Sequence, residues 1–199
     1  MKKTVIILFV CFFAKSYAQN ENKNKWYSNA DLELIIHSNV KYSFNYFDTD
    51  QNGNVSSTQE LRENKSALGL TYNLNYMVYN KLSIGILTGY KEYNQPDLSI
   101  VELGGVARYF FVDRNNVYTY VSVTNAVSLD KKQFSTGGNA RIGIGLPVIK
   151  GEKLNVNINI LKEQNFLRRK NGDPYIGLNQ ERPGTLIYNS WGISAGVAF

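Results

Sequence analysis

Positions 47–60, FDTDQNGNVSSTQE, carry oxygen-bearing residues at the spacing of a calcium-binding loop. The first ligands of such a loop would be Asp48, Asp50 and Asn52. An EF-hand loop closes with a bidentate glutamate at its twelfth position. Here the twelfth position is Gln59, and the glutamate comes one residue late, at Glu60. We therefore predict no metal site, with weak calcium binding by a surface loop as the open alternative, because Asp, Asn and Gly also build ordinary turns.

His37 and Ser38 are neighbours, and histidine with serine is the pair of residue types that activates a hydroxyl nucleophile. His37 is the only histidine in the chain. In a β-strand, neighbouring side chains point to opposite faces, so these two cannot hydrogen-bond to one another. We therefore predict no catalytic residues and give His37 a structural role.

The first 18 residues, MKKTVIILFVCFFAKSYA, have the pattern of a secretory signal peptide. Two lysines precede an apolar run at 4–14, and Ser16 and Ala18 provide the small residues of a cleavage site. The run is shorter than the roughly 20 apolar residues of a membrane-spanning helix. We predict a signal peptide over 1–18 and one exported domain over 19–199.

Charge and cysteine content narrow the class of protein further. The chain has 22 lysines and arginines against 16 acidic residues, a formal net charge of +6, and the cations are scattered rather than gathered in a stripe. We therefore predict no nucleic-acid partner. The single cysteine, Cys11, lies inside the signal peptide, so the exported domain has no disulfide to stabilise it. We also predict no cofactor.

Apolar and polar residues alternate with period two along most of the exported domain. In LNVNINI, at 154–160, the apolar residues lie on one face and three asparagines on the other. Amides that face a soluble apolar core would each cost kcal/mol, whereas a polar barrel interior satisfies them. The alternation predicts eight strands, over about 30–47, 65–79, 82–93, 98–112, 116–129, 135–149, 153–166 and 185–199. Their lengths exceed the roughly 5–6 residues usual in soluble strands and suffice to cross a bilayer.

The last ten residues, SWGISAGVAF, form such a strand and end in Phe199. Connections after the even predicted strands are short, and those at 48–64 and 167–184 are long. In these features the chain resembles small bacterial outer-membrane β-barrels of the OmpA/OmpX type. The resemblance implies an all-β, eight-stranded antiparallel up-and-down transmembrane β-barrel, surrounded by outer-membrane lipid. It also implies that the barrel-assembly machinery reads the strand that ends in Phe199.

A membrane barrel of this kind would carry aromatic girdles, which we place at Tyr42, Tyr72, Tyr76, Tyr90, Tyr109, Phe111, Trp191 and Phe199. The rival architecture is a secreted soluble barrel or sandwich with an apolar, lipocalin-like pocket. The two architectures put opposite faces of the same strands inside.

The face that we place inside the barrel collects charge, namely Glu33, Lys41, Glu102, Arg108 and Arg141. Eight strands enclose an interior just wide enough for side chains to fill. Charges buried there must pair or hydrogen-bond. We therefore predict a polar network that fills the lumen and leaves no pore for solutes.

The fold does not choose among functions, because small barrels serve many. The first hypothesis is a non-enzymatic outer-membrane protein with a structural, adhesive or surface-interaction role through its outside loops. The second is an accessory of an outer-membrane secretion or assembly machine, with other envelope proteins as partners. The third is a lipid-modifying enzyme that uses His37, Ser38 and Glu33.

Overall fold

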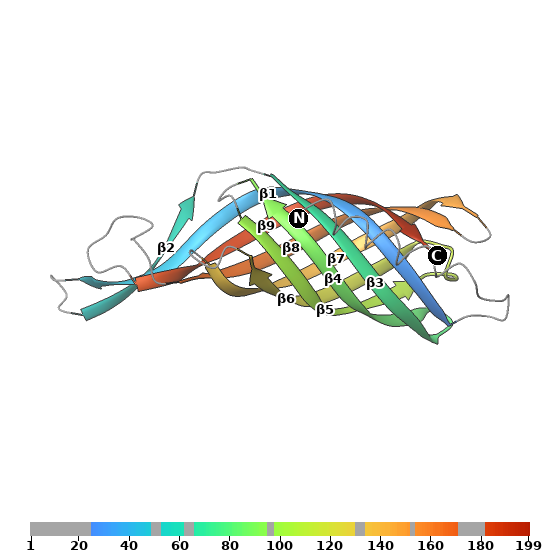
Figure 1. Ribbon diagram of the computed structural model, residues 1–199, viewed down its shortest axis with the longest axis horizontal. Coiled ribbons are helices and arrows are strands. Elements are labelled where there is room, and N and C mark those ends of the chain that lie inside the picture. The colour runs from blue at the N-terminus through green and yellow to red at the C-terminus, as the bar shows by residue number, and fades with distance from the viewer. Residues whose placement is uncertain are drawn as a thin grey trace.

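The structure is a computed structural model that describes residues 25–48, 53–61, 66–94, 98–129, 134–151, 154–170 and 182–199. The predicted signal peptide and residues 49–52 lie outside the described residues. The strands are β1 Trp26–Asp48, β2 Gly53–Leu61, β3 Ser66–Tyr79, β4 Leu82–Tyr93, β5 Leu98–Phe110, β6 Tyr118–Ser128, β7 Phe134–Lys150, β8 Asn155–Arg169 and β9 Arg182–Ala198 (Figure 1). No helix long and apolar enough to cross a membrane occurs in the described part of the chain.

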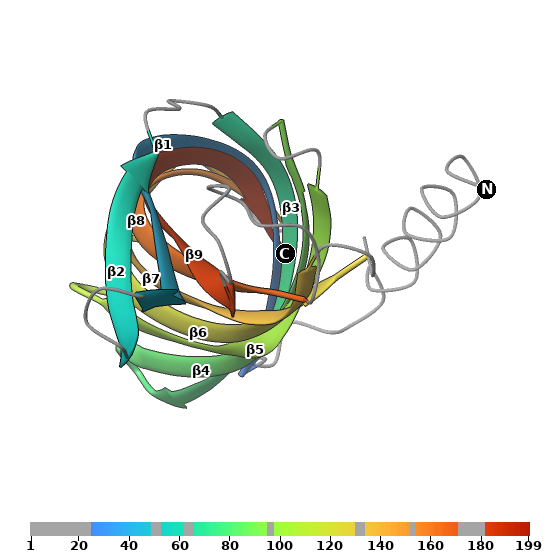
Figure 2. The same cartoon turned by 90° about the vertical axis from the view of Figure 1, so that its left-hand side faces the viewer.

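Eight of the strands close into an antiparallel barrel. The hydrogen-bonded order is β1-β3-β4-β5-β6-β7-β8-β9, and β9 pairs back onto β1 to complete the ring (Figure 2). Closure removes the free edges that an open sheet would leave. The prediction of an all-β, eight-stranded, up-and-down barrel is confirmed.

The ninth strand, β2, lies outside this ring and extends one end of the barrel. The lower part of β1, Trp26–Ile36, pairs with β3, whereas its upper part, Val40–Asp48, pairs with β2. β9 runs along both parts of β1. We call the assembly of Val40–Asp48, Gly53–Leu61 and Arg182–Tyr188 the outer ribbon, which projects at the left of Figure 1. The long connection predicted over 48–64 therefore contains a strand, Gly53–Leu61, because β1 continues upward and gives this polar segment a partner.

A bulge in β1 separates its two parts. The register between β1 and β9 shifts between His37 and Asn39. Below the shift odd-numbered side chains are buried inside, and above it even-numbered ones are. One inserted residue reverses every later side chain. Two predictions are wrong for this reason: Lys41 is exposed on the outer surface instead of facing the lumen, and Tyr42 is fully buried inside instead of joining a girdle.

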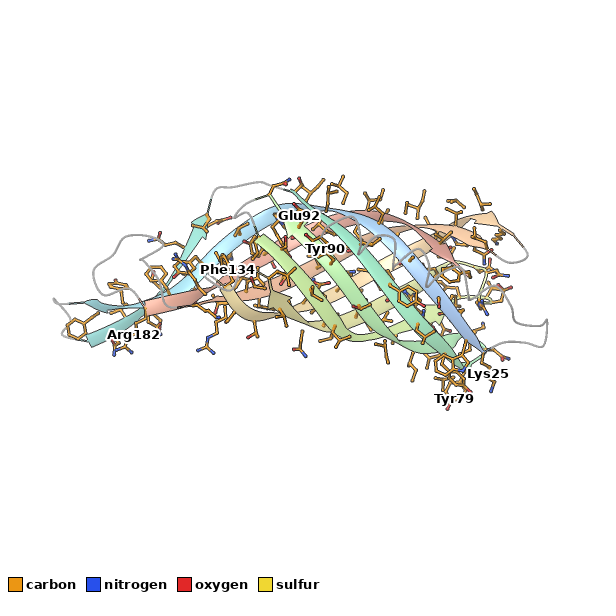
Figure 3. All side chains as sticks on the ribbon, viewed as in Figure 1. Lys25, Tyr79, Tyr90, Glu92, Phe134 and Arg182 are labelled. Carbon is orange, nitrogen blue, oxygen red and sulfur yellow. The ribbon has the colours of Figure 1, made fainter. Side chains whose placement is uncertain are left out.

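The outer face of the barrel is apolar and the inner face is polar. The exposed apolar belt includes Leu32, Leu34, Leu70, Leu74, Ile84, Ile86, Leu103, Val121, Val123, Ile142, Ile144, Ile160 and Ile193. Exposed aromatic rings flank it at Trp26, Tyr79, Tyr109 and Phe111 toward one end and at Tyr90 and Trp191 toward the other. Tyr79 and Tyr90 are labelled in Figure 3. An exposed apolar surface that circles the whole barrel fits lipid and not water. The soluble alternative, with its apolar face inside, is excluded.

The two ends of the barrel differ in their connections. The links at 80–81 and 111–117 share one end with Gly151 and Leu154, and there Ser28 and Phe199 also exchange backbone hydrogen bonds of 2.8 and 3.0 Å. The outer ribbon, the end of β8 at Arg169 and the start of β9 at Arg182 lie at the other end. Outer-membrane barrels have short periplasmic turns and longer outside loops. The outer ribbon therefore faces the cell exterior.

Candidate functional site

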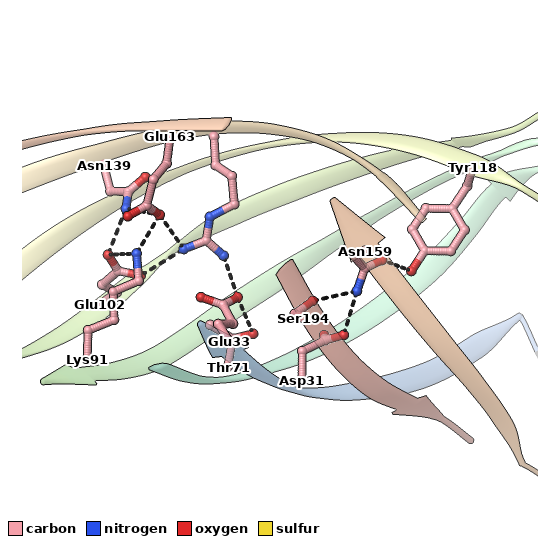
Figure 4. A network of polar contacts seen from close by, with 11 residues as sticks. Asp31, Glu33, Thr71, Lys91, Glu102, Tyr118, Asn139, Asn159, Glu163 and Ser194 are labelled. Atoms are coloured by element: carbon pink, nitrogen blue, oxygen red, sulfur yellow. Dashed lines mark hydrogen bonds and ion pairs between the residues drawn. The ribbon is translucent and has the colours of Figure 1, made fainter. Parts of the chain in front are cut away.

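Arg141 is the centre of a buried ion-pair cluster in the middle of the lumen. Its partners Glu33, Glu102 and Glu163 are labelled in Figure 4. Arg141 extends from β7 toward three carboxylates on three other strands. Its Nη1 lies 2.7 Å from Glu33 Oε1, and its Nη2 lies 3.1 Å from Glu163 Oε2 and 3.5 Å from Glu102 Oε2. A planar guanidinium can hold several carboxylates at once because its donors point outward in a fixed fork.

Lys91 on β4 is the second cation of this group, which we call the upper cluster. Its Nζ lies 2.6 Å from Glu163 Oε2 and 3.2 Å from Glu102 Oε1. None of these three side chains has any exposed surface. Asn139 Nδ2 donates to Glu102 and Glu163, at 3.0 Å each. Thr71 Oγ1 donates to Glu33 at 3.1 Å. The cluster ties β1, β3, β4, β5, β7 and β8 together, so its role in the barrel is a cross-link.

A second polar group, the lower cluster, lies nearer the periplasmic end. Asn159 Nδ2 donates to Asp31 at 3.0 Å and to Ser194 at 2.8 Å, and the Tyr118 hydroxyl donates to Asn159 Oδ1 at 2.7 Å. Arg108 donates to Asn75. The Arg108 guanidinium also lies 5.8 and 5.9 Å from the ring centroids of Tyr118 and Tyr120, within cation–π range.

Little open space is left between the two clusters. The cavity there, lined by Asp31, Glu33, Arg108 and Arg141 among others, has a volume of about 10 Å³. That is about the volume needed to hold one water molecule. On the ribbon side of the upper cluster the lumen is filled by buried apolar side chains, including Leu98, Ile100, Phe134, Leu167 and Leu186. From the lower cluster to the outer ribbon, the described part of the barrel is thus filled along its axis and offers a substrate no room.

His37 lies above the upper cluster in an enclosed aromatic setting. Its Nδ1 is 2.7 Å from Ser190 Oγ on β9, and its ring stacks on Tyr93, with centroids 5.5 Å apart. Ser38 instead points outward and donates to the carbonyl of Asn189 at 2.8 Å. The prediction that His37 and Ser38 do not pair agrees with this geometry, but Ser190 was missed. Because His37 is 2% exposed and Ser190 has no exposed surface, a substrate cannot reach either side chain.

One further sequence match to a nucleophile was overlooked. Residues 192–196, GISAG, fit the Gly-x-Ser-x-Gly spacing of a nucleophile elbow. An elbow requires a sharp turn from a strand into a helix. Ser194 instead lies within β9, faces the lumen and accepts the hydrogen bond from Asn159. It is a structural member of the lower cluster.

The sequence-predicted charges thus divide into three groups. Glu33, Glu102 and Arg141 meet in the upper cluster, Arg108 belongs to the lower cluster, and Lys41 is outside. Sequence reasoning missed Lys91 and Glu163. Both continue alternations already visible in their strands, two residues beyond Gly89 on β4 and four beyond Asn159 on β8. Following each inward series to the end of its strand would have found them.

The calcium-like stretch is only partly covered by the described residues. From Gly53 onward it is strand β2, in which alternate side chains point to opposite faces. An extended strand does not wrap its oxygen atoms around one ion. No group of three or more His, Cys, Asp or Glu side chains among the described residues is arranged to hold a metal.

Comparison with known proteins identifies the fold. No family model and no curated protein matches the sequence. Among solved structures, the outer membrane protein AlkL in lipid bilayers is 11% identical, with 92% of this chain and 93% of that chain covered and a TM-score of 0.51. The outer membrane protein OprG from Pseudomonas aeruginosa is also 11% identical, with 89% and 96% covered and a TM-score of 0.53.

At this identity the likeness establishes the fold and no activity. The closed eight-stranded ring, its apolar belt and these neighbours together define the class of protein. The chain is a small β-barrel of the bacterial outer membrane.

Proposed function

We propose that this barrel is a non-enzymatic surface protein that acts through its outer ribbon. The observation that carries the proposal is the filled lumen, in which a cavity of about 10 Å³ separates the two polar clusters. A solute cannot follow such a path, and the His37–Ser190 pair has no access for a substrate. A partner would then bind the outer ribbon, which is the part of the molecule that extends beyond the membrane.

The outer ribbon supports this role by its edge and its surface. Among the described strands, β2 pairs only with β1, so no described strand hydrogen-bonds to the backbone donors and acceptors of its other edge. Free edges bind extended segments of other chains by adding a strand. The outward side chains of β2 are polar and exposed, at Asn54, Ser56, Thr58 and Glu60. This combination suits a reversible contact with another protein more than a permanent apolar interface.

A double variant of the ribbon tests the proposal. Ser56→Tyr with Thr58→Tyr places two bulky side chains on the outward face of β2, whereas Glu92→Tyr places the same residue on the exposed rim of β4. Cells that lack the gene are complemented with each form and compared for cell–cell aggregation and surface adhesion. We expect the wild type and Glu92→Tyr to restore adhesion and the ribbon variant to fail. Full restoration by the ribbon variant would contradict the proposal.

A conductance measurement tests whether the lumen is closed to solutes. Purified protein in a planar lipid bilayer is expected to give no stepwise conductance. Regular steps of an open channel would show that solutes pass and would move the function from the ribbon to the lumen.

The free edge of β2 also supports a second candidate, an accessory of an outer-membrane secretion or assembly machine. Its partner would be another envelope protein that adds a strand to the ribbon. Deleting the gene would then trap exported cargo in the periplasm, whereas an adhesive role leaves cargo export unchanged.

A further inference from the structure

Among the described side chains, the outward-facing cations at the outer end of the barrel lie on one wall. Among described side chains, the outward cations of the upper strand segments are Lys41 on β1, Lys162 and Arg168 on β8, and Arg182 on β9. These three strands are neighbours in the sheet. The matching outward positions on β3 to β6 are occupied by Ser66, Glu92, Ser99 and Val127. We call the four cations the basic wall; Arg182 marks its outer limit and Glu92 the other side in Figure 3.

The basic wall starts where the apolar belt stops. Trp191 pairs with Ile36 on one side and with Lys162 on the other, and the Lys162 ammonium lies 5.4 Å from the Trp191 ring centroid. The next row below is apolar, with Ile160 and Ile193 exposed. The next row above is polar, with Gln164 Nε2 donating to Asn189 Oδ1 at 2.9 Å. Lys162 therefore lies at the level of the lipid headgroups.

Few acidic side chains lie on this wall in the part of the chain that the structure describes. Glu60, opposite Lys41 on β2, is the carboxylate that the described residues place there, and it accepts a hydrogen bond from Asn39. Lys162, Arg168 and Arg182 face Trp191, Thr185 and Asn45 across their strand pairs. The wall therefore presents a positive field to whatever lies beside it.

The height of the wall identifies the type of lipid. Lys162 and Arg168 are six residues apart on β8, about 20 Å along a strand. With the strand tilted by about 40°, Arg168 stands about 15 Å higher than Lys162. The interfacial layer of an ordinary bilayer is only about 5–8 Å thick on each side. An ordinary phospholipid headgroup at Lys162 would not reach Arg168, whereas a lipid with a tall, phosphorylated sugar headgroup would.

We propose that the basic wall binds the phosphate groups of a phosphorylated glycolipid in the outer leaflet. Lys162 meets a phosphate at the base of the headgroup, with Trp191 packed against the sugar–acyl boundary. Lys41, Arg168 and Arg182 meet anionic groups higher in the headgroup. The site lies on the outside of β1, β8 and β9 and is independent of any protein partner of the free edge of β2.

The test compares two glycolipids that differ only in phosphate. The probes are purified lipopolysaccharide with phosphorylated core sugars and the same lipopolysaccharide after enzymatic dephosphorylation. Binding to the refolded barrel in detergent micelles is measured by native mass spectrometry. We expect the wild type to prefer the phosphorylated form by about tenfold or more, because each cation near an anionic headgroup contributes about fivefold.

Two triple variants locate the effect. Lys41→Gln, Lys162→Gln and Arg168→Gln together should reduce the preference at least about fivefold relative to the wild type, since three of the four cations are lost. Lys25→Gln, Lys81→Gln and Lys150→Gln remove the same charge from the periplasmic end and should leave the preference unchanged. Heat-modifiable migration in gels shows that each variant is folded.

Three results would overturn the proposal. One is equal binding of the two glycolipids by the wild type. Another is a preference that survives in the wall variant. The third is displacement of the phosphorylated glycolipid by an equal concentration of phosphatidylglycerol, which would mean that the wall binds any anionic lipid.

Discussion

The charged residues inside the barrel and those on its outer wall are the same residue types in opposite settings. Inside, Arg141 and Lys91 are shared among three glutamates and have almost no exposed surface. Outside, Lys41 and Arg168 are exposed on strand faces with few carboxylates near them. The difference shows that, in this barrel, the face of the strand rather than the residue type decides whether a charge holds the fold or is left for a ligand.

The energetic consequences of the two settings diverge. A buried ion pair adds little net stability over an apolar replacement. Removing one partner, however, leaves the remaining charges buried without a counter-charge in a medium of low dielectric. An exposed cation is solvated whether or not it has a partner. Substitutions inside should therefore change stability, whereas substitutions outside should change lipid binding.

The largest expected effect comes from Arg141→Leu. It leaves Glu33, Glu102 and Glu163 with Lys91 as their cation in the upper cluster, so we expect a loss of about 3–5 kcal/mol in the free energy of unfolding. The measurement is urea unfolding in phosphatidylcholine vesicles, followed by the fluorescence of Trp26 and Trp191, which both face the lipid belt.

Arg168→Leu is the matched control, because it makes the same change on the outer wall. We expect it to alter stability by less than about 0.5 kcal/mol. Equal losses in the two variants would mean that the inside–outside difference does not govern the energetics of this barrel.

The bulge in β1 is the reason that Lys41 points outward. Removing the bulge should therefore move Lys41 from the outer face to the inner face. Deleting Ser38 would turn Lys41 toward the apolar interior of the outer ribbon and turn Tyr42 and Phe44 outward. We expect the ribbon to separate from the barrel and become sensitive to trypsin, while heat-modifiable migration of the barrel persists.

Ser38→Ala is the control for this deletion. It keeps the length of β1 and removes only the hydrogen bond to the Asn189 carbonyl. We expect its ribbon to resist trypsin as the wild type does. If the deletion were equally resistant, the register of β1 above His37 would have to be reassigned.

The same bulge marks the limit of what alternation predicts. Period two places Glu33, Glu102, Arg108 and Arg141 on the inner face because each lies in an uninterrupted strand segment. It fails at Lys41, since the register shift between His37 and Asn39 has no distinctive residue, neither glycine nor proline.

Which lumen charges pair with one another could not be predicted from the sequence either. Alternation gives the face of each residue but not its height, which depends on how far each strand is displaced against the next around the ring. Glu33 and Arg141 are 108 positions apart and meet only through this stagger. The strand β2 was missed for a related reason, because its polar composition reads as a loop until β1 is long enough to pair with it.

The smallest expected effect is the loss of an exposed lysine, and it is best compared with the loss of a buried one. Lys41 and Lys91 differ mainly in whether the side chain points out of the barrel or into the lumen. Lys41→Gln removes an exposed charge, and we expect the free energy of unfolding to change by less than about 0.5 kcal/mol. Lys91→Gln removes a cation that holds Glu102 and Glu163, and we expect a loss of about 1–3 kcal/mol.

Urea unfolding of the two lysine variants in the same vesicles measures this difference. Glutamine keeps much of the length and the hydrogen-bonding capacity of lysine, so what is compared is chiefly the charge. If Lys41→Gln were as costly as Lys91→Gln, Lys41 would have to lie in the lumen, and both the bulge and the basic wall would be wrong. If both were harmless, the upper cluster would be solvated, and the lumen would hold more water than a cavity of about 10 Å³ allows.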